Sequence, residues 1–167
     1  MDLRQGVFLD LATVDNGDLS LDALDRSLPG WSFHDATPPD ELGERIADAD
    51  VVVTNKVVLD AAALDRAQRL KLVVVCATGI NVIDLDAARE RGITVCNIRD
   101  YCSASVAQHV LTLILNLLTG QPFYGEHVRN GDWARSGIFS LHDRPIREIS
   151  NLSLGIIGYG ALGRATA

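Results

Sequence analysis

The sequence predicts an α/β protein that begins with a doubly wound parallel sheet. Short runs that are apolar throughout, such as residues 51–53 and 72–76, alternate with segments in which apolar residues recur at helical spacing. Strands that read as continuous apolar runs are typical of parallel sheets covered by helices on both faces. With 167 residues, of which 47% are hydrophobic, the chain is long enough to bury such a core.

Five strands and four helices are expected in residues 1–97. The expected strands are residues 6–9, 31–33, 50–54, 72–76 and 93–96. The expected helices are residues 20–28, a segment that begins at Pro39, a segment capped by Asp60, and residues 84–91, which Gly92 ends. This order predicts a flavodoxin-like domain, whose ligands bind beyond the carboxyl ends of the strands. The loops after Leu9, Val53, Cys76 and Cys96 are therefore the candidate site loops.

The composition changes after Asn97. Residues 103–118 predict a helix that is apolar nearly all round, which must be buried by its own domain or by another subunit. A polar stretch, residues 119–150, follows and contains a short helix near residues 123–130. Residues 152–157 then predict a further strand.

A glycine-rich turn directly follows that strand. Gly158, Gly160 and Gly163 form a G-x-G-x-x-G pattern that opens a helix, the context of a dinucleotide-binding fingerprint and of the start of a Rossmann domain. In such a turn the first glycine permits the tight bend, the second lets the backbone approach a pyrophosphate, and the third allows close packing. The acidic residue that binds the ribose is expected about 20 residues further on, past Ala167. We therefore expect an N-terminal fragment of a longer protein.

The composition also bears on partners and location. The 22 acidic and 15 basic side chains give a formal net charge of −7, which argues against non-specific nucleic-acid binding. The most apolar run, residues 106–118, is shorter than the about 20 residues that span a bilayer, and the amino terminus lacks the apolar core of a signal peptide. Cys76, Cys96 and Cys102 form no C-x-x-C pair, so we expect buried or partly buried free thiols in a cytoplasmic protein. No metal-ligand spacing is present.

Five segments together resemble the D-isomer-specific 2-hydroxyacid dehydrogenases, in particular the glycerate dehydrogenase, or hydroxypyruvate reductase, branch. The segments are Thr54-Asn55-Lys56, residues 76–101, the S-V-A-Q-H run of residues 105–109, Gly131-Asp132-Trp133, and residues 151–165. The first 50 residues resemble the family only in their alternation of strands and helices. Gln108 stands where the family more often has an acidic residue, and phosphoglycerate and D-lactate dehydrogenases share most of these motifs. The choice among 2-hydroxyacids therefore stays open.

The resemblance implies a two-domain, usually dimeric enzyme that transfers hydride between NAD or NADP and a 2-hydroxyacid/2-oxoacid pair. Residues 1–97 would be the substrate domain, and residues 98–167 the incomplete NAD(P)-binding domain. The helix of residues 103–118 would lie in a homodimer interface.

The resemblance also implies site residues. Backbone at Thr78 and Gly79 would meet the substrate carboxylate. The residues expected near the cofactor are Thr78, Val106, Gly158, Gly160, Ala161, Leu162 and Gly163. Backbone N–H groups can hold a carboxylate without a cationic side chain, which reconciles an acidic protein with an anionic substrate. Lys56 could assist, although an exposed surface lysine is the commoner reading of such a residue.

No catalytic residue can be assigned. In the family, the Arg, Glu and His that act on the carbonyl lie after the glycine turn. His34, His109, His127 and His142 read as loop, packing or surface residues. We therefore expect the 167-residue chain alone to be inactive. The alternative function is a non-enzymatic, NAD-sensing corepressor of the same superfamily. A phospho-accepting receiver is disfavoured, because Asn55 and Asn97 stand at its strand ends.

Overall fold

The computed structural model describes residues 2–167. The chain forms two compact units, one ending at Arg99 and the other running from Asp100 to Ala167. The sequence pattern placed this boundary between residues 97 and 98. Arg99 is followed by Asp100, the one described residue other than glycine with a positive φ, at 56°.

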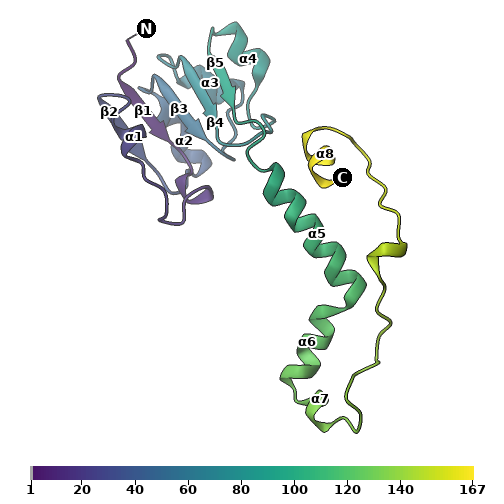
Figure 1. Ribbon diagram of the computed structural model, residues 1–167. Coiled ribbons are helices and arrows are strands. Elements are labelled where there is room, and N and C mark those ends of the chain that lie inside the picture. The colour runs from purple at the N-terminus through teal and green to yellow at the C-terminus, as the bar shows by residue number, and fades with distance from the viewer. Residues whose placement is uncertain (1) are drawn as a thin grey trace. The chain divides into compact units, whose positions relative to one another are not determined.

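The first unit is built on a five-stranded parallel sheet (Figure 1). Its strands are β1 (Gln5–Phe8), β2 (Gly30–Phe33), β3 (Val51–Thr54), β4 (Leu72–Val75) and β5 (Thr94–Asn97). They lie in the order β2-β1-β3-β4-β5, and every neighbouring pair is parallel. This order confirms the predicted flavodoxin-like fold.

The helices of this unit begin and end close to where the sequence predicts. They are η1 (Leu11–Thr13), α1 (Asp22–Asp25), α2 (Pro39–Ile46), α3 (Ala61–Arg66) and α4 (Leu85–Glu90). The Asp60 carboxylate caps α3 by accepting the Ala63 N–H at 2.8 Å, and Asp84 caps α4 in the same way at 2.9 Å. Gly92 follows α4 in the left-handed conformation, with φ at 66°. Only α1 is much shorter than the predicted helix of residues 20–28.

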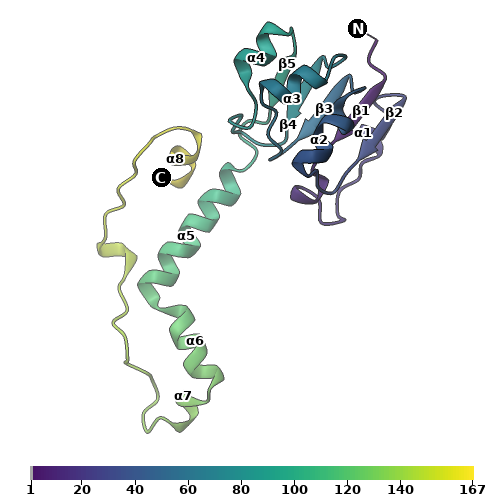
Figure 2. The same cartoon turned by 180° about the vertical axis from the view of Figure 1, so that it is seen from behind.

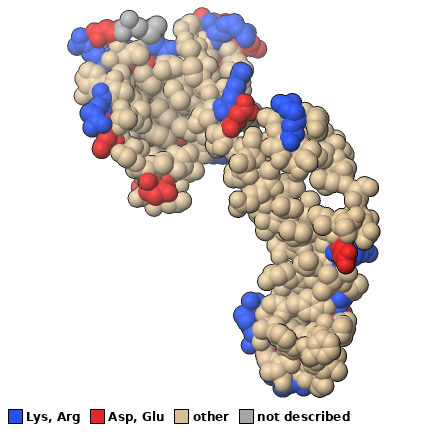
Figure 3. Space-filling view, viewed as in Figure 1, with Lys and Arg blue, Asp and Glu red and all other residues tan. Residues whose placement is uncertain are grey.

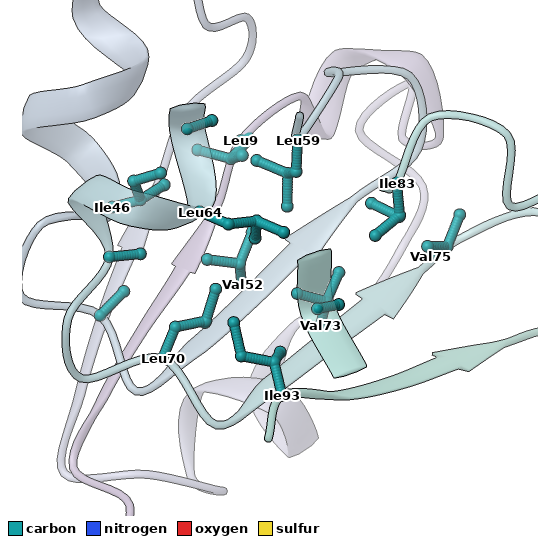
Figure 4. Close-up of a cluster of buried hydrophobic side chains, with 14 of the residues drawn as sticks. Leu9, Ile46, Val52, Leu59, Leu64, Leu70, Val73, Val75, Ile83 and Ile93 are labelled. Carbon is teal, nitrogen blue, oxygen red and sulfur yellow. The ribbon is translucent and has the colours of Figure 1, made fainter. Parts of the chain in front are cut away.

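The main core lies between the sheet and the layer formed by α2, α3 and α4. Figure 4 shows this cluster, to which the strands contribute Val52, Val73 and Val75 and the helices contribute Ile46 and Leu64. All five side chains are no more than 1% exposed. This layer fixes the positions of the strand ends, and with them the loops that carry the candidate site.

The second face of the sheet is covered only in part, which corrects the prediction that both faces are covered. Leucines of α1 and its flanks pack there against Phe8 and Trp31, beside β1 and β2. Beside β4 and β5 no described helix covers this face, so Val74 and Cys76 are only half-buried and Cys96 is exposed. The expectation of a buried or partly buried thiol was therefore wrong for Cys96. All three cysteines are free.

The second unit is mostly helical. It contains α5 (Ser103–Thr119), α6 (Gln121–Arg129), α7 (Asp132–Arg135), η2 (Ile149–Asn151) and α8 (Ala161–Thr166). Gly120, left-handed with φ at 64°, ends α5 and precedes α6. Within this unit α8 packs against α5, while α6 and α7 lie at the other end of α5 (Figures 1 and 2).

One prediction for this unit was wrong, and the predicted burial of the helix of residues 103–118 is not found within residues 2–167. Residues 152–157 form no strand, because a strand needs a hydrogen-bonded neighbour and no described segment pairs with them. The helix of residues 103–118, observed as α5, buries none of its residues, and Leu117 is 84% exposed. Nothing in residues 2–167 surrounds this helix as its apolar composition requires, so its burial by another subunit stays a prediction.

No single described helix is long and apolar enough to cross a membrane. The pair α5 and α6 reaches that length and composition only when taken together, and it bends by 64° between them.

Candidate functional site

The carboxyl ends of the parallel strands meet at one edge of the sheet, and the order of the strands reverses between β1 and β3. Ligands of doubly wound sheets bind in the crevice at such a reversal. The loops that meet there are residues 9–13, after β1, and residues 55–59, after β3. The third loop at this edge, residues 76–84, follows the neighbouring strand β4.

An internal anion occupies the reversal between β1 and β3. The carboxylate of Asp10, a residue only 3% exposed, accepts the N–H groups of Asn55 at 2.9 Å, Lys56 at 2.6 Å and Val57 at 3.2 Å. Burial, and after it the charge of Asp10, raises the pKa of the Cys76 thiol. Because Asp10 already takes these amides, they are not open to a ligand.

The turn after β4, unlike the loop after β3, has backbone N–H groups that no described residue accepts. Thr78 and Gly79 are exposed, and no group in the described residues accepts a hydrogen bond from the N–H of Thr78, Gly79 or Ile80. The carbonyls of the turn are instead engaged by the end of β5. Asn97 Nδ2 donates to Thr78 O at 2.8 Å, and the Ile98 N–H donates to Ala77 O at 3.2 Å. A turn whose N–H groups are free and whose carbonyls already accept hydrogen bonds is suited to bind a small anion such as a carboxylate.

A cationic residue follows each of the two strands that flank β4 in the sheet. Lys56 follows β3 and Arg99 follows β5, and β4 lies between these strands. Both are exposed, and neither forms an ion pair with a described residue. Lys56 was a candidate from the sequence and Arg99 was not, although the place of Arg99 just after an apolar strand was visible in the sequence.

The glycine turn of the second unit adopts the tight bend that its pattern predicts. Gly158 has φ at 92°, a left-handed value that a side chain would strain. A Cβ on Gly163 would lie 2.2 Å from Gly158 O, so only glycine fits there. A Cβ on Gly160 would meet nothing within 4 Å, which leaves its backbone open to approach. Ala161 and Leu162 begin α8, where helical amides have no intrahelical acceptor.

Val106 lies half-buried near the start of α5, the helix against which α8 packs. Between α5, α8 and residues 152–154 runs an apolar groove of about 490 Å³. Val110, Ile114 and Leu152 are among the side chains that line it. The structure therefore brings Val106 and the glycine turn into one unit, while Thr78 and Gly79 belong to the other.

The histidines do not form a catalytic pair at the strand ends. His34, the only histidine of residues 2–99, makes no described hydrogen bond to a carboxylate. His127, on α6, contacts Asp132 with its Nδ1 2.6 Å from the carboxylate, a pair that the sequence analysis missed. The His127 ring packs on Phe123, with 4.2 Å between ring centroids, so the pair ties α6 to α7. The described residues contain no group of three or more His, Cys, Asp or Glu side chains that could hold a metal ion.

Residues 14–162 match the family model described as the catalytic domain of the D-isomer specific 2-hydroxyacid dehydrogenases. A glycerate dehydrogenase of Methylorubrum extorquens is 44% identical over 129 residues, which are 77% of this chain and 41% of that protein. A hydroxypyruvate reductase of Blautia hydrogenotrophica is 35% identical over 163 residues, covering 96% of this chain and 50% of that protein. The chain thus spans about half the length of the curated relatives it matches.

Solved structures show the same fold. A putative D-isomer specific 2-hydroxyacid dehydrogenase of a Polaromonas species superimposes with a TM-score of 0.79 at 22% identity, covering 98% of this chain and 50% of that one. A glyoxylate/hydroxypyruvate reductase of Sinorhizobium meliloti, solved with NADP and malonate, gives 0.69 at 20% identity over 98% of this chain and 48% of that one. The family model covers most of the chain, and the fold agrees with it. The chain therefore belongs to the D-isomer specific 2-hydroxyacid dehydrogenase family.

Proposed function

We propose that the protein transfers a hydride between NAD or NADP and a 2-hydroxyacid/2-oxoacid pair such as glycerate and hydroxypyruvate. The observation that carries this proposal is the exposed turn after β4, whose N–H groups at Thr78, Gly79 and Ile80 have no acceptor in the described residues. These N–H donors would hold the carboxylate of the oxoacid and present its carbonyl to the cofactor. The names of the relatives in M. extorquens and B. hydrogenotrophica support this choice of substrate.

The glycine turn is the proposed cofactor site. The open space beside Gly160 would let a pyrophosphate approach the backbone, and the N–H groups of Ala161 and Leu162 would donate to it. Val106 would lie on the nicotinamide side, and Thr78 near both substrate and cofactor. The bound nicotinamide would supply the hydride.

A homodimer through α5 is part of the proposal. Leu111, Leu113 and Leu117 are 50%, 49% and 84% exposed, and α5 carries no Lys, Arg, Asp or Glu. Figure 3 shows a surface almost free of charge along this helix. A second copy of the helix would remove this apolar surface from water, which favours association.

Hydride transfer to a carbonyl needs a proton donor and a cation that polarises the oxygen. No histidine in residues 2–99 is paired with a carboxylate, and the His127–Asp132 pair ties α6 to α7 at the end of α5 that lies away from α8 and the glycine turn. We therefore also propose that the 167 residues alone do not turn over an oxoacid.

The test is to mix the protein in its native form with hydroxypyruvate and either NADH or NADPH. Loss of the near-ultraviolet absorbance of the reduced nicotinamide is expected with one of the two cofactors. Binding of the cofactor without turnover would instead support a corepressor-like sensor. A purified 167-residue chain of verified mass should give no loss of absorbance, and rapid turnover by it would contradict the last proposal.

A further inference from the structure

We infer that Asp10 is a positioning residue of the oxoacid site, acting through the backbone of the loop after β3. This inference rests on the proposed function. The Asp10 carboxylate accepts the N–H groups of three successive residues, Asn55, Lys56 and Val57. Lys56 is therefore held by its own backbone amide at the carboxyl edge of the sheet, beside the end of β4.

Hydrogen bonds continue from this loop to the proposed substrate turn. Leu59, at the end of the loop, donates its N–H to Val82 O at 2.8 Å and accepts the Asp84 N–H at 3.0 Å. Leu59 and Ile83 thus form a parallel bridge. The Ile83 N–H in turn donates to Ile80 O at 3.0 Å. The loop that Asp10 holds is consequently tied to the turn whose N–H groups at Thr78, Gly79 and Ile80 have no acceptor in the described residues.

Loss of the Asp10 carboxylate would leave N–H groups of the loop after β3 without an acceptor. Asn55 is 8% exposed, so water cannot readily satisfy its N–H in place of Asp10. An Asp10→Asn side chain has nearly the same shape but only one acceptor oxygen, and its amide NH₂ would face a backbone N–H. The loop must then shift, and the shift would move both Lys56 and the bridge to the substrate turn.

Simple charge repulsion predicts the opposite result. Burial is the larger cause of the raised pKa of the Cys76 thiol, and the nearby negative charge of Asp10 adds to it. If this charge mainly repelled an anionic oxoacid, Asp10→Asn would tighten oxoacid binding. If Asp10 mainly positions the loop, the same change weakens it. The sign of the effect therefore separates the two roles.

The experiment titrates hydroxypyruvate into the 167-residue chain and follows the amide chemical shifts of Thr78, Gly79 and Ile80. For the unsubstituted chain we expect saturable shifts at these three residues. Asp10→Asn is expected to raise the Kd about tenfold. Lys56→Gln should also weaken binding, but it should have a smaller effect when Asp10→Asn is already present, because both act through the same loop.

Asp50 provides a matched control. Its side chain is 7% exposed, and its carboxylate accepts two backbone N–H groups, from Arg4 and Gln5, each at 2.9 Å. It lies at the amino ends of β1 and β3, the opposite edge of the sheet. Asp50→Asn should therefore lower stability and leave the hydroxypyruvate Kd unchanged.

The outcomes are separable. An unchanged or lower Kd for Asp10→Asn, with clear binding by the unsubstituted chain, would overturn the positioning role and leave the proposed function intact. An equal rise in Kd for Asp50→Asn would overturn it as well, because the effect would then be general destabilisation. No shift at Thr78, Gly79 or Ile80 in the unsubstituted chain would overturn the proposed substrate turn together with this inference.

Discussion

At the scale of single residues, two buried aspartates tie the strands together at opposite edges of the sheet. Asp10 accepts backbone amides at the carboxyl edge, and Asp50 does so at the amino edge, where Arg69 also donates to it. A buried carboxylate is stable only when such donors replace the water it has lost. For Asp50, the pKa of the carboxyl group reports the balance between burial and these donors.

Asp50 should make the fold sensitive to acid. Burial alone would raise its pKa, but the N–H groups of Arg4 and Gln5 and the Arg69 guanidinium outweigh burial and hold the pKa below the ordinary value of 3.8. A carboxyl with a lowered pKa in the fold stabilises it above pH 3.8, and this stabilisation is lost as the pH falls through the lowered pKa. Urea unfolding in this acid range should show a shallower dependence of the unfolding free energy on pH for Asp50→Asn. An unchanged dependence would contradict the assignment.

The glycine turn supplies a second prediction at this scale. Gly163→Ala should disrupt the turn, because the added Cβ would lie 2.2 Å from Gly158 O. Gly155→Ala is the matched control, since a Cβ there meets nothing within 4 Å and its φ is not left-handed. Amide chemical shifts of Gly158 and Gly160 should change in the first variant and stay in place in the second. Equal shifts in both would show that the close approach is not what the turn requires.

At the scale of elements, α5 has the apolar composition of a buried helix but is not buried. Its side chains are apolar on nearly every side, yet none is buried by residues 2–167. A helix of this kind is stable in water only when another surface covers it. The same mismatch appears in residues 152–157, which are apolar but form no strand.

The α5 proposal predicts an effect on assembly. Leu117→Asp should weaken the homodimer at least tenfold, because a charge would replace an 84% exposed leucine at the interface. Leu19→Asp, at a leucine 52% exposed in the first unit, is the control and should leave the dimer intact. Sedimentation equilibrium would measure both. A monomeric unsubstituted protein, or equal effects of the two changes, would count against an interface on α5.

At the scale of the whole molecule, order is distributed unevenly along the chain. Residues 2–99 have a buried core, whereas residues 136–148 contain no helix or strand and are mostly exposed. Segments of this kind are the first that proteases cleave. Limited chymotrypsin digestion should cut first after Phe139, which is 91% exposed, while Phe8, at 4%, stays intact. Mass spectrometry of the early fragments would check this, and an early cut after Phe8 would contradict it.

The sequence predicted most of the first unit because its signals are local. Pro39, Asp60, Asp84 and Gly92 each begin or end a helix through contacts a few residues away. It did not predict the bond between Asp10 and Asn55, because that contact joins residues 45 positions apart and no periodicity encodes it. It overpredicted the strand at residues 152–157, because an apolar run states only a preference for burial and cannot supply a neighbouring strand.

The glycine turn also has a consequence for how this chain folds. Its left-handed Gly158 and its close Gly163 contact involve residues only five positions apart, and they are present although residues 152–157 lack a sheet. A structure with such local determinants pays almost no loop-closure entropy. The turn therefore needs few long-range contacts to form, whereas α8, with six residues, depends for its stability on packing against α5.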